Sequence, residues 1–127
     1  MMKIEHVSLY TKDLARTRAF YETYFGGIAG ALYHNPKTGL QTYFLSFADG
    51  ARLELMTRPE LAETVEGMRV GWAHLAFSTG SREQVDGLTA RLRADGYSVV
   101  SGPRVTGDGY YESCVLDPDG NTVEITV

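Results

Sequence analysis

The chain has 127 residues, a formal net charge of −4 at pH 7 and an apolar fraction of 43%. This length suits one compact domain, and the apolar fraction is too high for a disordered chain. The mild negative charge, with no lysine- or arginine-rich run, excludes nucleic acid and anionic membrane as expected partners, because both require a concentrated basic patch.

The first half of the chain predicts the element order β-α-β-β-β. Apolar and β-branched residues alternate over 3–10, which indicates a strand. Asp13 is the expected N-cap of a helix that ends before Gly26 and Gly27. Leu14, Tyr21, Tyr24 and Phe25 are expected to share one face of this helix. Three further short strands are expected over 28–33, 41–47 and 52–57.

The second half predicts the same order again. Residues 71–78 form the expected first strand, and Ser81 with Gln84 forms a capping box at the start of a helix. This helix is expected to end at Asp95-Gly96. Its predicted buried stripe consists of Val85, Leu88 and Leu92. The remaining strands are expected over 98–105, 110–116 and 122–127.

The repeated order predicts an α+β fold with two β-α-β-β-β repeats, 3–57 and 71–127. A linker over 58–70 joins them within a single domain, 1–127. One helix can cover only one face of its sheet, so each repeat is expected to leave its other face open. Two such repeats can bring their mixed sheets together and curl them into an open half-barrel cleft.

Four polar residues interrupt apolar strand patterns at matching places in the two repeats. His6 and His74 lie in the first strands, and Glu54 and Glu124 lie in the last strands. The separation is 48 positions from His6 to Glu54 and 50 positions from His74 to Glu124. Successive side chains of a strand point to opposite faces, so the apolar neighbours are expected under the helix and these four side chains in the cleft.

Two imidazoles and two carboxylates that converge in this way would suit one divalent metal ion. Zn²⁺ or Ni²⁺ is the expected ion, and Co²⁺, Fe²⁺ or Mn²⁺ also accept such ligands. One or two coordination positions would stay open for water or substrate. A chain of this size folds without a metal, so the ion would serve chemistry. The alternative is that each of the four is an ordinary solvated residue.

Several segments resemble the vicinal-oxygen-chelate superfamily, which includes glyoxalase I, extradiol dioxygenases, fosfomycin-resistance proteins and bleomycin-binding proteins. They are IEHVSL at 4–9, LEL at 53–55, AHLAF at 73–77, DPDGN at 117–121 and VEI at 123–125. The resemblance spans nearly the whole chain, and DPDGN before the last strand is its most specific part. It implies the paired-sheet fold, a small-molecule substrate and a homodimer.

The ligand pattern His, Glu, His, Glu is similar to that of glyoxalase I. This resemblance implies a metal-dependent lyase or isomerase acting on a small α-oxygenated carbonyl compound, with Glu124 or Glu54 as the catalytic residue that moves the proton. Glyoxalase I has an arginine near the end of the first strand, where this chain has Tyr10. The resemblance therefore supports a glyoxalase-like protein without the glutathione motif, and Arg58, just beyond the Glu54 strand, is another source of positive charge.

Two other functions stay open. One is a non-catalytic antibiotic-binding protein of the bleomycin-resistance type, which usually lacks the ligand set that this chain keeps. The other is a fosfomycin-type metal-dependent transferase, a group that typically has a residue other than Glu at the position of Glu54.

Further polar and aromatic residues have two interpretations each. Glu112 and Cys114 alternate along one predicted strand, where they either line the pocket or are a solvated Glu and a small buried Cys. Aromatic strand residues either line a substrate pocket or pack in the core. They are Tyr43, Trp72, Tyr110 and Tyr111.

The sequence also bears on cellular location. The single cysteine cannot form an internal disulfide, which suits a reducing compartment. The first residues, MMKIEH, contain no apolar run of signal-peptide length, and no run approaches the roughly 20 apolar residues of a membrane span. We therefore expect a cytoplasmic protein.

Overall fold

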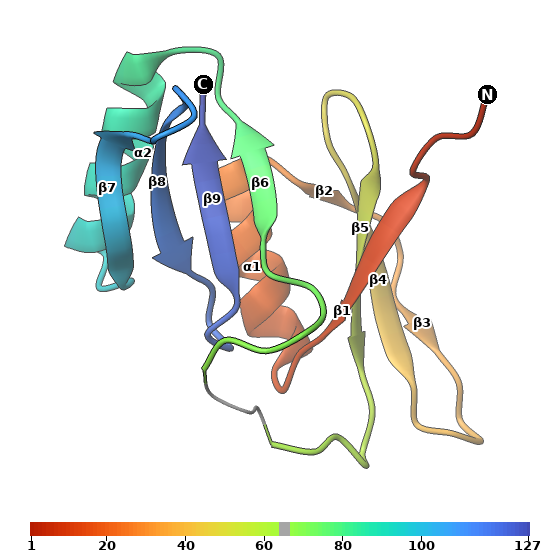
Figure 1. The fold of residues 1–127 in the computed structure, drawn as a ribbon. Helices are drawn as coiled ribbons and strands as arrows, with labels where there is room; N and C mark the ends of the chain where they lie inside the picture. The colour runs from red at the N-terminus through yellow and green to blue at the C-terminus, as the bar shows by residue number, and fades with distance from the viewer. Residues whose placement is uncertain (64–66) are drawn as a thin grey trace. The chain divides into compact units, whose positions relative to one another are not determined.

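The structure is a computed structural model that describes residues 1–63 and 67–127. These residues form two mixed β-sheets, each with one helix (Figure 1). The chain divides into two units by its own contacts, Met1–Thr64 and Val65–Val127. The second unit has the predicted order β-α-β-β-β, and the first unit differs from it only by one additional short strand. The α+β fold class is confirmed. Within the described residues no helix combines the length and the apolar character needed to cross a bilayer.

The first unit has five strands and one helix. They are β1 (His6–Tyr10), α1 (Leu14–Phe25), β2 (Ile28–Ala29), β3 (Tyr33–His34), β4 (Gln41–Ser46) and β5 (Arg52–Thr57). The strand order is β1-β5-β4-β2, and β3 also pairs with β4. β1 runs parallel to β5, whereas β4 pairs antiparallel with β2, β3 and β5. The first and last strands of the unit are therefore neighbours.

Helix α1 contacts β2, β4 and β5 of its own sheet. The Asp13 side chain accepts a hydrogen bond from the Arg16 backbone N–H at 3.1 Å, and Gly26 ends the helix in the left-handed conformation with φ 71°. The buried residues are Leu14, Thr17, Phe20 and Tyr21. Tyr24 and Phe25 are half-buried, and their rings lie 5.4 Å and 5.7 Å from the ring of the buried Phe20. The four buried residues are spaced three or four positions apart along one side of the helix, and they include Phe20, which the sequence analysis did not name.

The second unit has four strands and one helix. They are β6 (Leu75–Ser78), α2 (Arg82–Ala94), β7 (Val99–Val105), β8 (Tyr111–Leu116) and β9 (Thr122–Thr126). The strand order is β6-β9-β8-β7. β6 runs parallel to β9, and the other pairs are antiparallel. As in the first unit, the first and last strands lie side by side.

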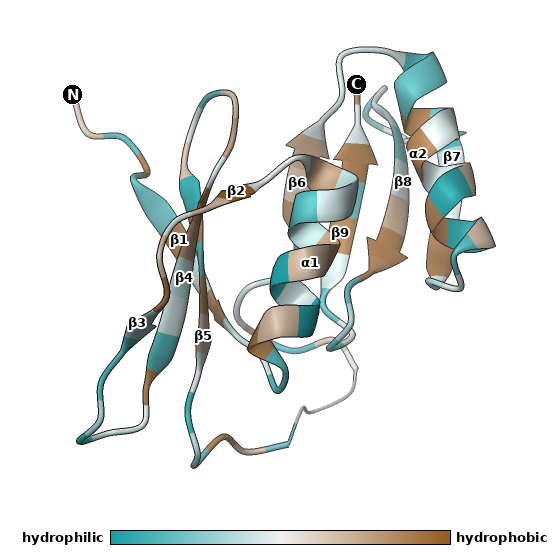
Figure 2. Ribbon diagram, turned by 180° about the vertical axis from the view of Figure 1, so that it is seen from behind, coloured by the Kyte–Doolittle hydropathy of each residue, from teal (hydrophilic) through white to brown (hydrophobic). Residues whose placement is uncertain are grey.

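Helix α2 packs against β7, β8 and β9. Ser81 accepts a hydrogen bond from the Gln84 backbone N–H at 3.2 Å, as predicted for the cap. Val85 and Leu92 are buried, but the third buried residue is Thr89 and not Leu88. The Thr89 hydroxyl contacts the Val85 carbonyl and the Ser113 hydroxyl, each at 2.6 Å, so burial leaves it hydrogen-bonded. Figure 2 shows teal and brown segments alternating along α2.

The strand predicted over 28–33 is broken into β2 and β3. Ala29 pairs with Leu45, whereas Tyr33 pairs with Thr42, so the register against β4 changes by one residue between them. The Gly30 backbone N–H still donates to the Phe44 carbonyl at 3.0 Å. One extra residue on an edge strand interrupts the ladder locally, as in a β-bulge.

The first strand of each unit begins later than predicted. β1 begins at His6, although the Arg52 backbone N–H still donates to the Glu5 carbonyl at 2.9 Å. β6 begins at Leu75, which pairs with Val123, the second residue of β9. His74 therefore lies directly before its strand. In the predicted linker, residues 64–66 lie outside the described residues, and 58–63 and 67–70 contain neither helix nor strand.

Candidate metal centre

Both sheets place a carboxylate between two buried apolar side chains. Leu53 and Leu55 on β5 are 3% and 0% exposed, and Val123 and Ile125 on β9 are both 0% exposed. The side chains of Glu54 and Glu124 alternate with these residues and are 16% and 25% exposed. Alternation along the strands thus places each glutamate on the sheet face opposite its buried neighbours, as predicted.

In the first unit, His6 and Glu54 lie diagonally across the β1–β5 ladder. Ser8 is the direct partner of Glu54, and His6 is paired two residues earlier with Arg52. The distance from His6 Nε2 to Glu54 Oε1 is 3.9 Å. The Ser8 hydroxyl donates to the same Glu54 oxygen at 2.5 Å. Ser8 therefore holds this carboxylate beside the imidazole.

The other nitrogen of His6 faces a second carboxylate. His6 Nδ1 lies 2.5 Å from Glu5 Oε2, and the Arg52 guanidinium donates to the remaining oxygen, Oε1, of Glu5. These hydrogen bonds to the charged form, with the His6 contact the largest cause, hold the pKa of Glu5 below its ordinary value. Arg52 also lies over the Phe44 ring at 4.2 Å, and the edge of His6 meets the same ring at 5.3 Å between centroids.

In the second unit, His74 and Glu124 repeat the diagonal. Ala76 is the direct partner of Glu124, and continuing this register by two residues places His74 beside Thr122. His74 Nε2 lies 3.1 Å from Glu124 Oε2. Ala76 occupies the place that Ser8 has in the first unit and has no hydroxyl. Glu124 thus has no hydroxyl donor from its strand partner, and it lies closer to its histidine than Glu54 does.

Glu112 and Cys114 lie on the same face of β8 and β9 as Glu124. Cys114 is the direct partner of Glu124 across the ladder. Burial, followed by a hydrogen bond to Glu124, raises the pKa of Glu112. Burial and then the Glu124 charge raise the pKa of the Cys114 thiol, so it stays protonated near neutral pH and is a poor nucleophile. Both side chains are half-buried.

The donor sets fit a divalent transition metal. Nitrogen and oxygen ligands at about 2.0–2.2 Å from one ion lie roughly 3–3.4 Å apart. The 3.1 Å separation of His74 and Glu124 falls in this range, and the 3.9 Å separation of His6 and Glu54 is about half an ångström wider. Each unit thus offers two of the four predicted ligands. Within the described residues, no three His, Cys, Asp or Glu side chains gather as one metal-binding group.

The structure separates the aromatic residues into two groups. Tyr43 pairs with Leu55, and the Arg18 guanidinium lies over its ring at 4.8 Å, so it packs on the helix side of its sheet. Tyr111 donates from its hydroxyl to Asp86 of α2 and also packs on the helix side. The remaining two, Trp72 and Tyr110, are exposed.

Tyr10 and Arg58 lie at one end of the β1–β5 pair. Tyr10 pairs with Met56, and a hydrogen bond with Tyr10 raises the pKa of Arg58 above its ordinary value. Arg58 is also 3.1 Å from Glu60. The arginine thus stands beside the tyrosine that occupies the expected arginine position, as the sequence led us to consider.

Two residues of the first unit were missed by the sequence reasoning. Ser8 shares the alternation of His6, and this signal could have placed its hydroxyl beside a neighbouring strand. Glu5 precedes His6 directly, so strict alternation predicts that the two side chains point apart. Glu5 lies outside β1, however, and its side chain reaches the imidazole.

Comparison with known proteins supports the same family. Residues 3–125 match the family model of the Glyoxalase/Bleomycin resistance protein/Dioxygenase superfamily. YqjT of Bacillus subtilis, described as uncharacterized, is 30% identical over 129 residues that cover 96% of each chain. A possible glyoxalase from Bacillus cereus is 28% identical, with a TM-score of 0.75 over 100% of both chains.

A more distant structure shares the fold alone. The trypanothione-dependent glyoxalase I of Leishmania major is 20% identical, with a TM-score of 0.79, and the match covers 99% of this chain and 86% of that protein. Together with the diagonal His–Glu pairs, these matches define the class. The chain belongs to the Glyoxalase/Bleomycin resistance protein/Dioxygenase superfamily.

Proposed function

We propose that this protein is a metal-dependent lyase or isomerase of the glyoxalase type that acts on a small α-oxygenated carbonyl compound. His6, Glu54, His74 and Glu124 would hold one divalent ion, Zn²⁺ or Ni²⁺ in the first place, with Co²⁺, Fe²⁺ or Mn²⁺ as alternatives. Lactoylglutathione lyase activity is the narrower form of the proposal.

One observation carries this proposal: the same diagonal His–Glu pair occurs in both units. The Nε2 atom faces a carboxylate oxygen at 3.9 Å in the first pair and 3.1 Å in the second. Each pair lies on the face of its sheet away from the buried leucine, valine and isoleucine side chains. The same two residue types at equivalent positions of both sheets support a shared role.

The chain's own residues would supply binding and proton transfer. When bound, the ion would supply Lewis-acid stabilisation of negative charge that develops on adjacent substrate oxygens. Glu124 or Glu54 would take a proton from one carbon of the substrate and return it to the neighbouring carbon. Glu112 and Cys114 would form part of the pocket wall beside Glu124.

The same proposal includes the assembly and the setting of the protein. Residues 1–127 would act as one domain, with ligands from both units meeting at one ion. Dimerisation and small-molecule substrates are common in this superfamily, and we propose a homodimer with such a substrate. The unpaired Cys114 supports a location in the reducing cytoplasm.

Turnover of 2-oxoaldehyde–thiol adducts tests the enzymatic part. The hemithioacetal of methylglyoxal and glutathione, and adducts with smaller thiols, are mixed with Zn²⁺- or Ni²⁺-loaded protein, and thioester formation is followed by absorbance. We expect conversion by the wild type and a loss of about 10²-fold or more for Glu124→Gln or Glu54→Gln, the usual range for a lost general base. Glu22→Gln on α1 is the matched control and should keep full activity.

The outcomes separate the candidate functions. Conversion of a smaller-thiol adduct without conversion of the glutathione adduct would keep the lyase proposal and remove glutathione. No conversion of any adduct by protein that carries its metal would rule out the lactoylglutathione lyase form of the proposal and leave a lyase or isomerase for other α-oxygenated carbonyl compounds. Tight binding of bleomycin by protein without metal would then support the antibiotic-binding alternative.

A further inference from the structure

We propose that Glu5 is a positioning residue that fixes the orientation and tautomer of His6, so that the unprotonated Nε2 atom points toward the metal centre. The tautomer is a property of the chain alone. Its consequence for metal affinity rests on the proposed function above.

The hydrogen bond between Glu5 and His6 determines which ring nitrogen carries the proton. An ionised carboxylate can only accept hydrogen bonds, so His6 Nδ1, 2.5 Å from Glu5 Oε2, must be the donor. A neutral imidazole has one N–H, which leaves Nε2 with a free lone pair. Nε2 is the atom that faces Glu54, at 3.9 Å. The free lone pair therefore lies on the side of the other proposed ligand.

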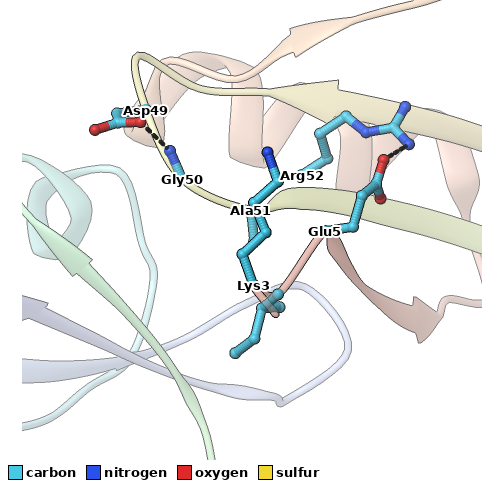
Figure 3. A pocket seen from close by; sticks show the side chains of 7 residues that line it. Lys3, Glu5, Asp49, Gly50, Ala51 and Arg52 are labelled. Carbon is cyan, nitrogen blue, oxygen red and sulfur yellow. Dashed lines mark hydrogen bonds and ion pairs between the residues drawn. The ribbon is translucent and has the colours of Figure 1, made fainter. Parts of the chain in front are cut away.

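Glu5 is itself held from its other side. Its Oε1 atom accepts from the Arg52 guanidinium, and Figure 3 shows the two side chains turned toward each other. Arg52 lies over the Phe44 ring, and the His6 ring meets the same ring edge-on. His6 is thus fixed by a hydrogen bond at Nδ1 and by an aromatic contact.

The free space beside Glu5 makes this residue easy to change without disturbing the core. Glu5 and Arg52 line a hollow of about 630 Å³ together with Lys3, Ile4 and the 49–51 turn (Figure 3). The Glu5 side chain is 55% exposed. Truncation to alanine therefore removes the carboxylate and leaves no buried cavity.

The second unit provides an internal comparison. The residue before His74 is Ala73, and Ala76 stands in the place of Ser8. The carboxylate next to the histidine is thus a feature of the first unit and not of the repeat. Glu5→Ala makes the first unit resemble the second at this position.

Nitrogen-15 NMR of the histidine rings tests the proposal in metal-free protein. Spectra of wild type, Glu5→Ala and the control Glu22→Ala are recorded at about pH 8.5, well above the titration of free imidazole. His6→Gln assigns the His6 signals. Glu22 is a suitable control because it is also a partly exposed glutamate paired with an arginine, Arg18, in the same unit.

We expect His6 to carry its proton on Nδ1 in the wild type and in Glu22→Ala. In Glu5→Ala the proton should move largely to Nε2, because Glu54 is then the carboxylate left beside the ring. A wild-type His6 protonated on Nε2, or a tautomer that Glu5→Ala does not change, would overturn the proposal. These readouts do not depend on whether the protein binds a metal.

Zn²⁺ titration gives the second readout. Loss of an outer carboxylate that orients a ligand histidine typically weakens metal binding about 10–100-fold. We expect a loss in this range for Glu5→Ala and no change for Glu22→Ala. An unchanged affinity in Glu5→Ala would overturn the positioning role, whereas a wild type that binds no Zn²⁺ would contradict the proposed function instead.

Discussion

The turn before β9 positions Glu124 through one buried carboxylate. Asp117 is 4% exposed, and its Oδ1 accepts from the backbone N–H groups of Asp119 and Asn121, both at 2.9 Å. Its Oδ2 accepts from the Asn121 side-chain amide, also at 2.9 Å. The turn is thus a closed set of hydrogen bonds, which accounts physically for the DPDGN segment in front of the glutamate strand.

Asp117→Ala is expected to lower the free energy of unfolding by about 2–3 kcal/mol. It removes the acceptor of three hydrogen bonds, from the backbone N–H groups of Asp119 and Asn121 and from the Asn121 amide. Each lost hydrogen bond costs about 1 kcal/mol. Urea unfolding followed by circular dichroism measures the change.

The control for this prediction is Asp49→Ala. Asp49 is an exposed turn aspartate whose carboxylate accepts from the Gly50 backbone N–H at 2.7 Å. We expect it to change stability by less than about 0.5 kcal/mol, as for most surface positions. Equal effects of the two substitutions would contradict the account of the Asp117 turn.

The orientation of a side chain could be predicted from the sequence where alternation along the strand alone determines which sheet face it lies on. Glu54 and Glu124 follow this rule because both lie inside regular strands between buried residues. The neighbours Glu5 and Ser8 could not be assigned their contacts, since these depend on the β1–β5 register and on a side chain outside the strand.

At the scale of elements, β7 bends where a glycine meets the neighbouring strand. The β7–β8 register shifts between Val99 and Ser101 and again between Ser101 and Arg104, the interval that contains Gly102. Gly102 has φ +79°, and a Cβ there would lie 2.5 Å from the Glu112 carbonyl oxygen and 3.0 Å from the Ser113 Cα. Only glycine fits both the conformation and the close approach. The residue thus determines how β7 lies against the strand that carries Glu112 and Cys114.

Gly102→Ala is expected to destabilise the protein by more than about 2 kcal/mol, because a left-handed conformation and a backbone clash both oppose the new Cβ. The matched substitution is Gly87→Ala inside α2, where a Cβ meets nothing within 4 Å. It should stabilise the protein by about 0.5–1 kcal/mol. Urea unfolding of both variants measures the two changes in the free energy of unfolding, which should have opposite signs. Two changes of the same sign would contradict this explanation of Gly102.

The elements were predicted well where local signals act alone. The caps at Asp13, Gly26 and Ser81 were read correctly because each depends on neighbouring residues. The break between β2 and β3 was missed, since it arises from the register against β4. Thr89 was missed as a buried residue, because its hydroxyl partner comes from a strand 24 positions away.

At the scale of the whole molecule, the two units have the same strand order and the same diagonal His–Glu pair. The repeated element order predicted this likeness, because each half carries its own helix and strands. The differences at the site are local: Ser8 and Glu5 support the first pair, whereas Ala76 and Ala73 stand in the second. Alternation determines only the side of a strand that each side chain faces, so the sequence predicts each pair within its own unit.

The central claim is that both units contribute ligands to one shared ion. Zn²⁺ binding to metal-free protein, measured by isothermal titration calorimetry, tests it with His6→Ala, His74→Ala and the control His34→Ala, which changes an exposed histidine. We predict one ion per chain in the wild type. Either ligand substitution should weaken it by more than about 100-fold, beyond the usual effect of outer-shell changes. Two ions per chain, each lost with a substitution in only one unit, or wild-type binding that neither substitution weakens, would contradict the shared centre.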